Sequence, residues 1–117
     1  MEHSGQLHRS GRVTLDADGA GQIYFVTDNA WQRWEVTQVV VATTQTPTQT
    51  PVPQAYLYVN TPNSAGNQHG GSWSGSQDTF TGLMHVGPCD TLYVTFAGGI
   101  AGTTATAVVE GTWFRRG

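Results

Sequence analysis

The chain has 117 residues, the usual length of a single domain, and only 11% of them are charged, against roughly 25% in typical proteins. Its formal net charge is −3, and its only strong cations are five Arg, so it lacks the basic stripe of a nucleic-acid-binding protein. No stretch is long and apolar enough for a membrane span, and the first residues lack the apolar centre of a signal peptide. Cys89 is the only cysteine, which excludes an internal disulfide. We expect one small domain that binds neither nucleic acid nor membrane and that folds in a cytoplasm.

The N-terminal quarter contains an irregular segment followed by two short apolar runs. Residues 1–11 show no periodicity, so we expect an extended arm that reaches a neighbouring molecule. Residues 12–15 alternate between polar and apolar side chains, residues 22–27 form a second, largely apolar run, and residues 16–21 between them contain Asp-Gly. Two apolar runs joined in this way predict a β-hairpin.

The middle of the chain contains the longest predicted strand. Over residues 33–44, Trp34 and Val36 share one face and Val39 and Val41 the other. Either this strand is covered on both faces or a β-bulge near Thr37 and Gln38 returns all four to one side, and we favour the bulge. Residues 45–53 contain three Pro and predict a surface loop. Residues 54–60 predict a further strand, with Leu57 and its alternate neighbours inward and Tyr56 and Tyr58 outward.

The C-terminal half continues the pattern of short strands and turns. Residues 61–72 are polar and predict a loop, followed by short segments around Trp73 and Phe80 and a strand at 83–86. Residues 87–90 predict a turn between that strand and the next, at 91–96. A glycine-rich loop then leads to a last strand at 104–114 and a tail at 115–117. The sandwich domain is therefore expected to span residues 12–114.

These elements define an all-β fold, because no window shows a sustained helical period. About eight short strands separated by turns predict an antiparallel β-sandwich, which we expect to be jelly-roll-like. The alternation also predicts the core: Leu15, Phe25, Trp34, Val36, Leu57, Val59, Leu92, Val94, Phe96 and Val109.

No catalytic, cofactor-binding or metal-binding constellation emerges from the polar residues. Asp16 and Asp18 resemble the start of a calcium loop, but Gly19 comes too early and Thr27 stands where the closing Glu should be, so we expect a turn capped by Asp side chains. Residues 71–75 differ from a nucleophile elbow, because Trp73 occupies the position of the serine.

The remaining reactive side chains also favour structural roles. His3, His8, His69 and His85 lack the spacing of zinc ligands, and we expect His85 at a surface or an interface. Asp78 and Asp90 flank separate strands, so nothing in the sequence pairs them as an acid and a base. Cys89, in a turn after Pro88, is expected to be a small buried residue.

Aromatic residues are the candidates for a binding surface. They could stack on sugar rings, lie in a subunit contact, or pack within the domain, which is the commonest outcome for a single aromatic residue. The candidate interface residues are Tyr56, Tyr58, Trp31, Trp73, Trp113 and Phe114.

Several short motifs resemble those of a family of phage proteins. They are TLDxxGxG within residues 13–21, W-x-V-x-x-V within 34–41, GxxxGxxD at 71–78 and GGxxGxxAxxxVxG at 98–111. In this order they resemble small β-sandwich structural proteins of the virions of tailed phages that infect high-GC Gram-positive bacteria.

The resemblance implies a non-enzymatic structural component of a phage virion, either on the capsid surface (a decoration or minor capsid protein) or attached to the tail. It implies many copies, partners among the major capsid or tail proteins, and assembly in the host cytoplasm, with no cofactor. Outward aromatics on a chain of low charge suggest contact with copies of itself, in a trimer or a ring. The alternative is a carbohydrate-binding module of a host-recognition or fibre assembly, whose ligand would be a glycan.

Overall fold

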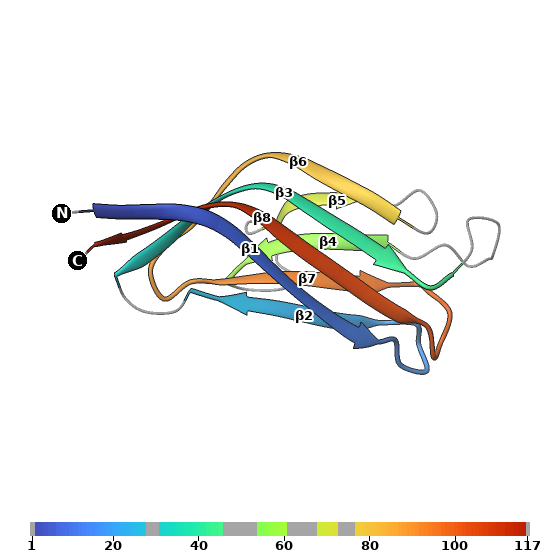
Figure 1. Cartoon of the computed structure of the whole chain (residues 1–117). Helices are drawn as coiled ribbons and strands as arrows, with labels where there is room; N and C mark the ends of the chain where they lie inside the picture. The colour runs from blue at the N-terminus through green and yellow to red at the C-terminus, as the bar shows by residue number, and fades with distance from the viewer. Residues whose placement is uncertain (1, 28–30, 46–53, 61–67, 73–76, 117) are drawn as a thin grey trace.

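The computed structural model describes residues 2–27, 31–45, 54–60, 68–72 and 77–116. These residues form eight strands in two four-stranded sheets that face each other (Figure 1). The first sheet has the order β1-β8-β3-β6 and the second the order β2-β7-β4-β5, and every pairing is antiparallel. The strands are β1 (Glu2–Thr14), β2 (Gly21–Val26), β3 (Gln32–Thr43), β4 (Gln54–Val59), β5 (Gln68–Ser72), β6 (Gln77–Val86), β7 (Thr91–Ala97) and β8 (Thr104–Arg116).

This strand order confirms the expected jelly-roll-like sandwich. Among the described strands, only β4 and β5 are neighbours both in sequence and in a sheet, because the chain otherwise crosses from one sheet to the other between consecutive strands. The expected hairpin of residues 12–15 and 22–27 is therefore wrong: β1 pairs with β8, and β2 pairs with β7.

The turn between β1 and β2 does form as expected, although it joins two sheets. The Oδ1 atom of Asp16 accepts hydrogen bonds from the backbone N–H groups of Asp18, at 2.9 Å, and Ala20, at 3.0 Å. Gly19 has φ +72°, and its carbonyl oxygen accepts a hydrogen bond from the N–H of Gly99. The turn is thus bound to the loop before β8. This contact joins residues far apart in the sequence, so the pattern of residues within the turn could not predict it.

The space between the sheets holds the core that the alternation predicts. All ten predicted residues are buried there, and Trp34 and Phe96 are the largest fully buried side chains. The bulge predicted near Thr37 and Gln38 is also confirmed, because the pairing of β3 with both neighbours shifts between Val36 and Gln38. The shift returns Val39 and Val41 to the inner side, where both are buried.

The ends of the chain differ from the expected arm and tail. Residues 2–11 belong to β1, which pairs without a break along β8 as far as Arg116, and Leu7 is buried. Gly5 lies opposite Trp113, and a Cβ atom on Gly5 would lie 2.5 Å from the Trp113 ring. The glycine that suggests an irregular arm therefore provides space for an aromatic ring.

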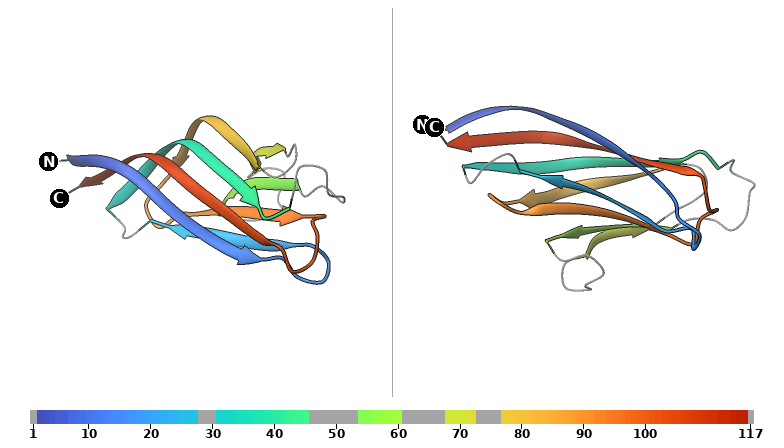
Figure 2. Two further views of the ribbon diagram at one scale, coloured as in Figure 1. Left: turned by 45° about the vertical axis from the view of Figure 1, so that its right-hand side comes forward. Right: turned by 90° about the horizontal axis from the view of Figure 1, so that it is seen from below.

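Both termini lie side by side at one end of an elongated molecule, whose principal extents are 50 × 23 × 21 Å (Figure 2). Parts of β1, β3 and β8 extend there beyond the second sheet (Figures 1 and 2). We call this region the terminal projection and define it as residues 2–6, 31–33 and 112–116.

Two further expectations for local structure are wrong. Residues 68–72, expected in a loop, form β5, a short strand at the edge of the second sheet. Their polar and glycine-rich composition carries no apolar alternation that would reveal a strand. Cys89 is exposed instead of buried and has φ +65°, because it lies within the turn from β6 to β7. Of the expected loop at 45–53, residues 46–53 lie outside the described part of the chain.

Candidate interaction surfaces

The candidate aromatic residues lie in two separate places. Tyr56 and Tyr58 lie on β4 in the second sheet, whereas Trp31, Trp113 and Phe114 lie in the terminal projection of the first. Trp73 lies outside the described residues. The five described candidates therefore do not form one surface.

A row of tyrosines crosses the outer face of the second sheet. Tyr24 on β2 pairs directly with Tyr93 on β7, and Tyr93 pairs directly with Tyr58 on β4. The ring centroids of Tyr24 and Tyr93 are 6.4 Å apart with an interplanar angle of 47°. Tyr56, two residues before Tyr58, has its ring centroid 6.4 Å from that of Tyr58. All four tyrosines of the chain therefore gather on this face, which we call the tyrosine face.

Exposure increases across the tyrosine face from β4 to β2. Tyr58, expected to point into solvent, is 6% exposed, and Tyr56 and Tyr93 are half-buried. Tyr24 is 65% exposed, and Val26, two residues further along β2, is 48% exposed. Tyr24 and Tyr93 are absent from the sequence candidates, although strict alternation with Phe25 and Leu92 would have placed both outward.

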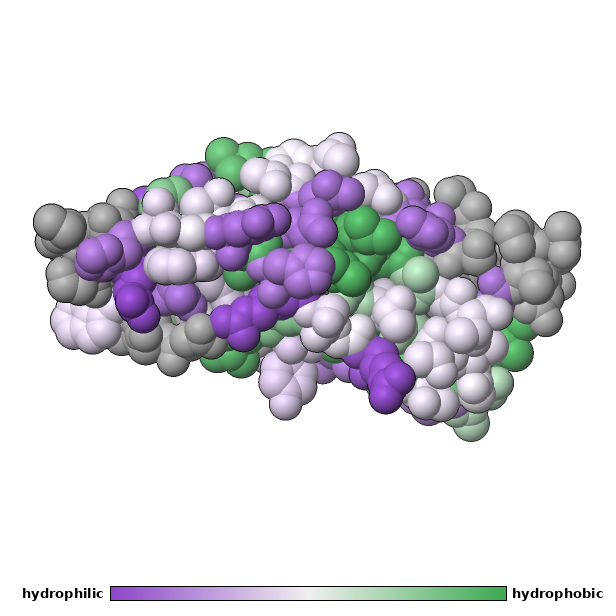
Figure 3. All heavy atoms as spheres, in the orientation of Figure 1, coloured by the Kyte–Doolittle hydropathy of each residue, from purple (hydrophilic) through white to green (hydrophobic). Residues whose placement is uncertain are grey.

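The two sheets also differ in charge. None of the residues of β2, β4 or β7 is Asp, Glu, Lys, Arg or His, whereas all five Arg lie on β1, β3 and β8 of the first sheet. Figure 3 shows hydrophilic side chains gathered over β1, β8 and β3, mostly on the half of the molecule nearer the termini. The outer surface of β2, β7 and β4 is therefore neutral and aromatic, whereas that of the first sheet is charged.

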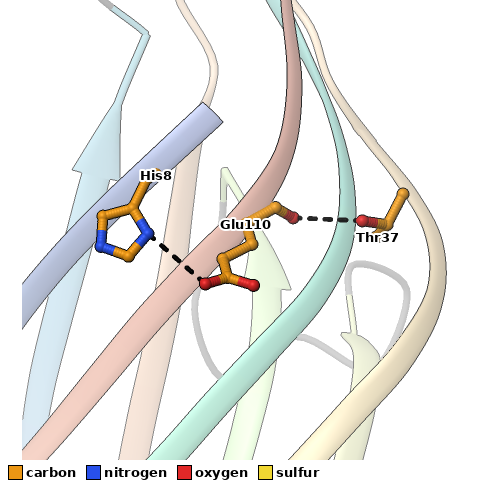
Figure 4. A network of polar contacts seen from close by, with 3 residues as sticks. All are labelled: His8, Thr37 and Glu110. Carbon is orange, nitrogen blue, oxygen red and sulfur yellow. Dashed lines mark hydrogen bonds and ion pairs between the residues drawn. The ribbon is translucent and has the colours of Figure 1, made fainter. Parts of the chain in front are cut away.

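Basic and acidic side chains lie close together on the charged surface. The Nδ1 atom of His8 lies 3.4 Å from Oε1 of Glu110, the residue opposite it on β8 (Figure 4). The backbone carbonyl of Glu110 accepts a hydrogen bond from the Thr37 hydroxyl at the bulge of β3. Glu35 lies 3.5 Å from Arg33 and 3.9 Å from His85, which is exposed as expected. Pairs as exposed as these contribute little to stability and chiefly set the charge pattern of the surface.

The terminal projection combines aromatic rings with arginine. The Arg33 guanidinium lies 4.1 Å from the centroid of the Phe114 ring, and that of Arg115 lies 5.7 Å from the Trp113 ring. Trp113 and Phe114, both candidate interface residues, are half-buried, and Trp113 packs against the core. Trp31, immediately before β3, is 64% exposed. Aromatic residues and Arg are the types that protein interfaces favour.

The carboxylates of Asp78 and Asp90 accept hydrogen bonds from nearby groups. The Oδ1 atom of Asp78 accepts the N–H of Thr79, and Asp90 accepts the N–H of Gly87 through Oδ2 and the Asn60 amide through Oδ1. Among the described residues, no three His, Cys, Asp or Glu side chains are grouped as metal ligands. The described part of the chain also contains no helix long and apolar enough to cross a membrane.

A cleft of about 340 Å³ opens beside the bulge of β3 and the edge strand β6. Its floor is apolar and includes Val36, Leu57 and Phe80, and its described lining contains no Asp, Glu, His, Cys, Lys or Arg. The lining thus lacks the titratable side chains of an acid–base or nucleophilic site.

Comparison with known proteins finds similarity in structure alone. Neither a protein-family model nor a curated protein sequence matches the chain. A chain in the acid-stable capsid structure of Helicobacter pylori bacteriophage KHP30 is similar, with a TM-score of 0.58 and 8% identity over 97% of this chain and 93% of that one. The BFDV capsid protein, solved as a decamer, has a TM-score of 0.52 and 8% identity over 100% of both chains. These likenesses concern the fold, and they do not support the high-GC Gram-positive host that the sequence motifs imply.

Proposed function

We propose that this protein is a non-enzymatic structural component of a virion, present in many copies on the capsid surface or attached to the tail. The observation that carries the proposal is the strand order of its two sheets, because the double-sheet jelly roll is a recurrent architecture of viral capsid proteins. The two capsid proteins of similar structure support it, as do the phage-like sequence motifs.

The chemistry of the described side chains supports a role without catalysis. The carboxylates of Asp16, Asp78 and Asp90 accept hydrogen bonds from nearby N–H groups, and Glu35 and Glu110 pair with basic side chains. The described lining of the cleft beside β6 contains no titratable group. These arrangements fix turns and link strands.

We propose the terminal projection as the surface that attaches the protein to its partners. It contains the exposed Trp31, the Arg33–Phe114 contact, and both ends of the chain. The partners would be copies of this chain, in a trimer or a ring, and the major capsid or tail proteins beneath them. Tyr56 and Tyr58 lie on the second sheet, outside this surface, and Tyr58 is too buried to contribute much area to another contact.

The test is to purify virions from the source of this gene, quantify the chain in them by mass spectrometry and locate it by cryo-electron microscopy. A virion role predicts a fixed, high copy number and ordered density at symmetry-related positions, with the terminal projection against the particle. Particles that lack the chain would refute the proposal.

The second candidate, a carbohydrate-binding module of a fibre or host-recognition assembly, is favoured by the tyrosine face, since jelly rolls also form lectin domains. The same micrographs distinguish the two candidates. A module would lie at the tip of a fibre in a few copies, instead of on a regular lattice.

A further inference from the structure

We propose that the exposed side of the tyrosine face, at Tyr24 and Tyr93, binds an uncharged oligosaccharide. The proposal does not rest on a virion role, because it concerns a ligand of the second sheet, whichever assembly carries it. Its basis is the juxtaposition of two tyrosine rings, neighbouring hydroxyl and amide side chains, and an absence of charge on three adjacent strands.

The two rings offer the kind of surface on which a sugar ring packs. Tyr24 and Tyr93 are held opposite each other by the pairing of β2 and β7, with ring centroids 6.4 Å apart. Sugar rings carry C–H groups on their faces and hydroxyl groups around their edges. A tyrosine matches both features, because its ring is apolar and rigid while its hydroxyl group donates and accepts hydrogen bonds. Tyr24, at 65% exposed, is open to such a contact.

The residues around the rings provide further uncharged hydrogen-bonding groups. Gln22 lies two residues before Tyr24 on the same side of β2, and Thr91 lies two residues before Tyr93 on the same side of β7. Because none of the residues of β2, β7 or β4 carries a charge, the face offers no ion pair to a phosphate, a carboxylate or a nucleic acid. A neutral ligand is therefore the one that it matches.

The size of the face favours a small ligand over a protein. Three strands of six or seven residues cover roughly 20 Å by 15 Å, or about 300 Å². A standard protein interface buries about 800 Å² of accessible surface on each partner, so a second copy of the chain would have to reach beyond these three strands. A short oligosaccharide fits within this area.

The test is calorimetric titration of the purified chain with neutral hexasaccharides of glucose, mannose, galactose and N-acetylglucosamine, with hexagalacturonate as the anionic comparison. We expect at least one neutral hexasaccharide to bind and hexagalacturonate not to bind. Tyr24→Ala should weaken binding by about tenfold or more, whereas Tyr24→Phe, which keeps the ring, should stay within about threefold of wild type. Leu83→Ala is the matched control, because Leu83 is 62% exposed on β6 of the other sheet and should not change the affinity.

Nuclear magnetic resonance of the unmodified protein makes the test independent of how the variants fold. Saturating the bound hexasaccharide should perturb the ring protons of Tyr24 and Tyr93 more than those of the buried Tyr58. The proposal is overturned if no neutral hexasaccharide binds the wild-type chain, or if Tyr24→Ala binds as well as wild type. It is also overturned if Tyr24→Ala changes the sedimentation of the unliganded protein, since the face would then be a contact between copies.

Discussion

Single buried side chains on the inner faces of the sheets hold the sandwich together. Val94 is fully buried on β7 and lies between Ile23 on β2 and Leu57 on β4. Val94→Asp would bury a carboxylate without a partner, so we expect a loss of several kcal/mol, most of the stability of a small domain. Urea unfolding and thermal unfolding, both followed by circular dichroism, measure the loss. Gln22→Asp, at an exposed position on β2, is the matched control and should melt close to wild type. A Val94→Asp variant that melts within a few degrees of wild type would contradict the inward facing of β7.

Gly111 is a second residue whose identity the packing restricts, because its position has no room for a Cβ atom. It lies opposite Val36, next to the bulge of β3, and an added Cβ atom would overlap the Glu35 carbonyl oxygen and lie 2.9 Å from the Val36 Cα atom. Backbone atoms cannot swing away as a side chain can, so we expect Gly111→Ala to cost about 1–3 kcal/mol. Thr112→Ala, at the next and half-buried position, should cost less in the same urea titration. Equal stabilities of the two variants would show that β3 and β8 have room to separate.

At the scale of strands, the sequence predicts the facing of side chains better than the pairing of strands. The bulge in β3 is predictable because a regular strand would place Trp34 and Val36 on one face and Val39 and Val41 on the other. One core can bury all four side chains only if the strand contains an extra residue between the two pairs. The prediction of a hairpin between β1 and β2 is wrong. The residues around Asp16 indicate that the chain turns there, but they do not indicate which sheet the next strand joins.

The tyrosine face shows the same limit. Alternation places Tyr24, Tyr56, Tyr58 and Tyr93 on outward positions, but their meeting in one row depends on the register of β2 with β7 and of β7 with β4. That register is set by contacts between residues far apart in the sequence, which no local pattern contains. Tyr58 also shows that an outward position is not always an exposed one.

The two halves of β1 should respond differently to truncation. Deleting residues 2–6 removes only the part of β1 in the terminal projection, and we expect the fold to persist with a melting temperature within a few degrees of wild type. Deleting residues 2–10 also removes the buried Leu7, and we expect marked destabilisation, because a truncated core side chain costs about 2–5 kcal/mol. Thermal denaturation of the two truncated chains measures the difference.

The shorter truncation also tests attachment. If the terminal projection contacts the particle, virions assembled with the chain lacking residues 2–6 should contain fewer copies of it by mass spectrometry. If virions contain as many copies of the truncated chain as of the wild-type chain, residues 2–6 are not part of the proposed contact. In the stability experiment, equal melting temperatures of the two truncated chains would show that the core does not need Leu7.

At the scale of the whole molecule, the two surfaces of the sandwich have separate chemistry. The arginines, the ion pairs and both termini belong to the first sheet, and the tyrosines belong to the second. A protein mounted through its terminal projection would leave the tyrosine face free for a ligand. The proposed attachment and the proposed glycan site are therefore compatible within one chain.

This separation predicts which substitutions alter self-association. The terminal projection presents Trp31, 64% exposed, beside the Arg33–Phe114 contact, and exposed aromatic residues next to Arg are typical centres of protein contacts. We expect the purified chain to form a trimer or a closed ring in sedimentation velocity at high micromolar concentration, and Trp31→Ala to shift it toward the monomer. Leu83→Ala removes an equally exposed side chain from β6 and should leave the distribution of oligomers unchanged.

A wild-type chain that sediments as a monomer would mean that the projection contacts only other proteins of the particle. Equal effects of the two substitutions would mean that self-association is not centred on Trp31.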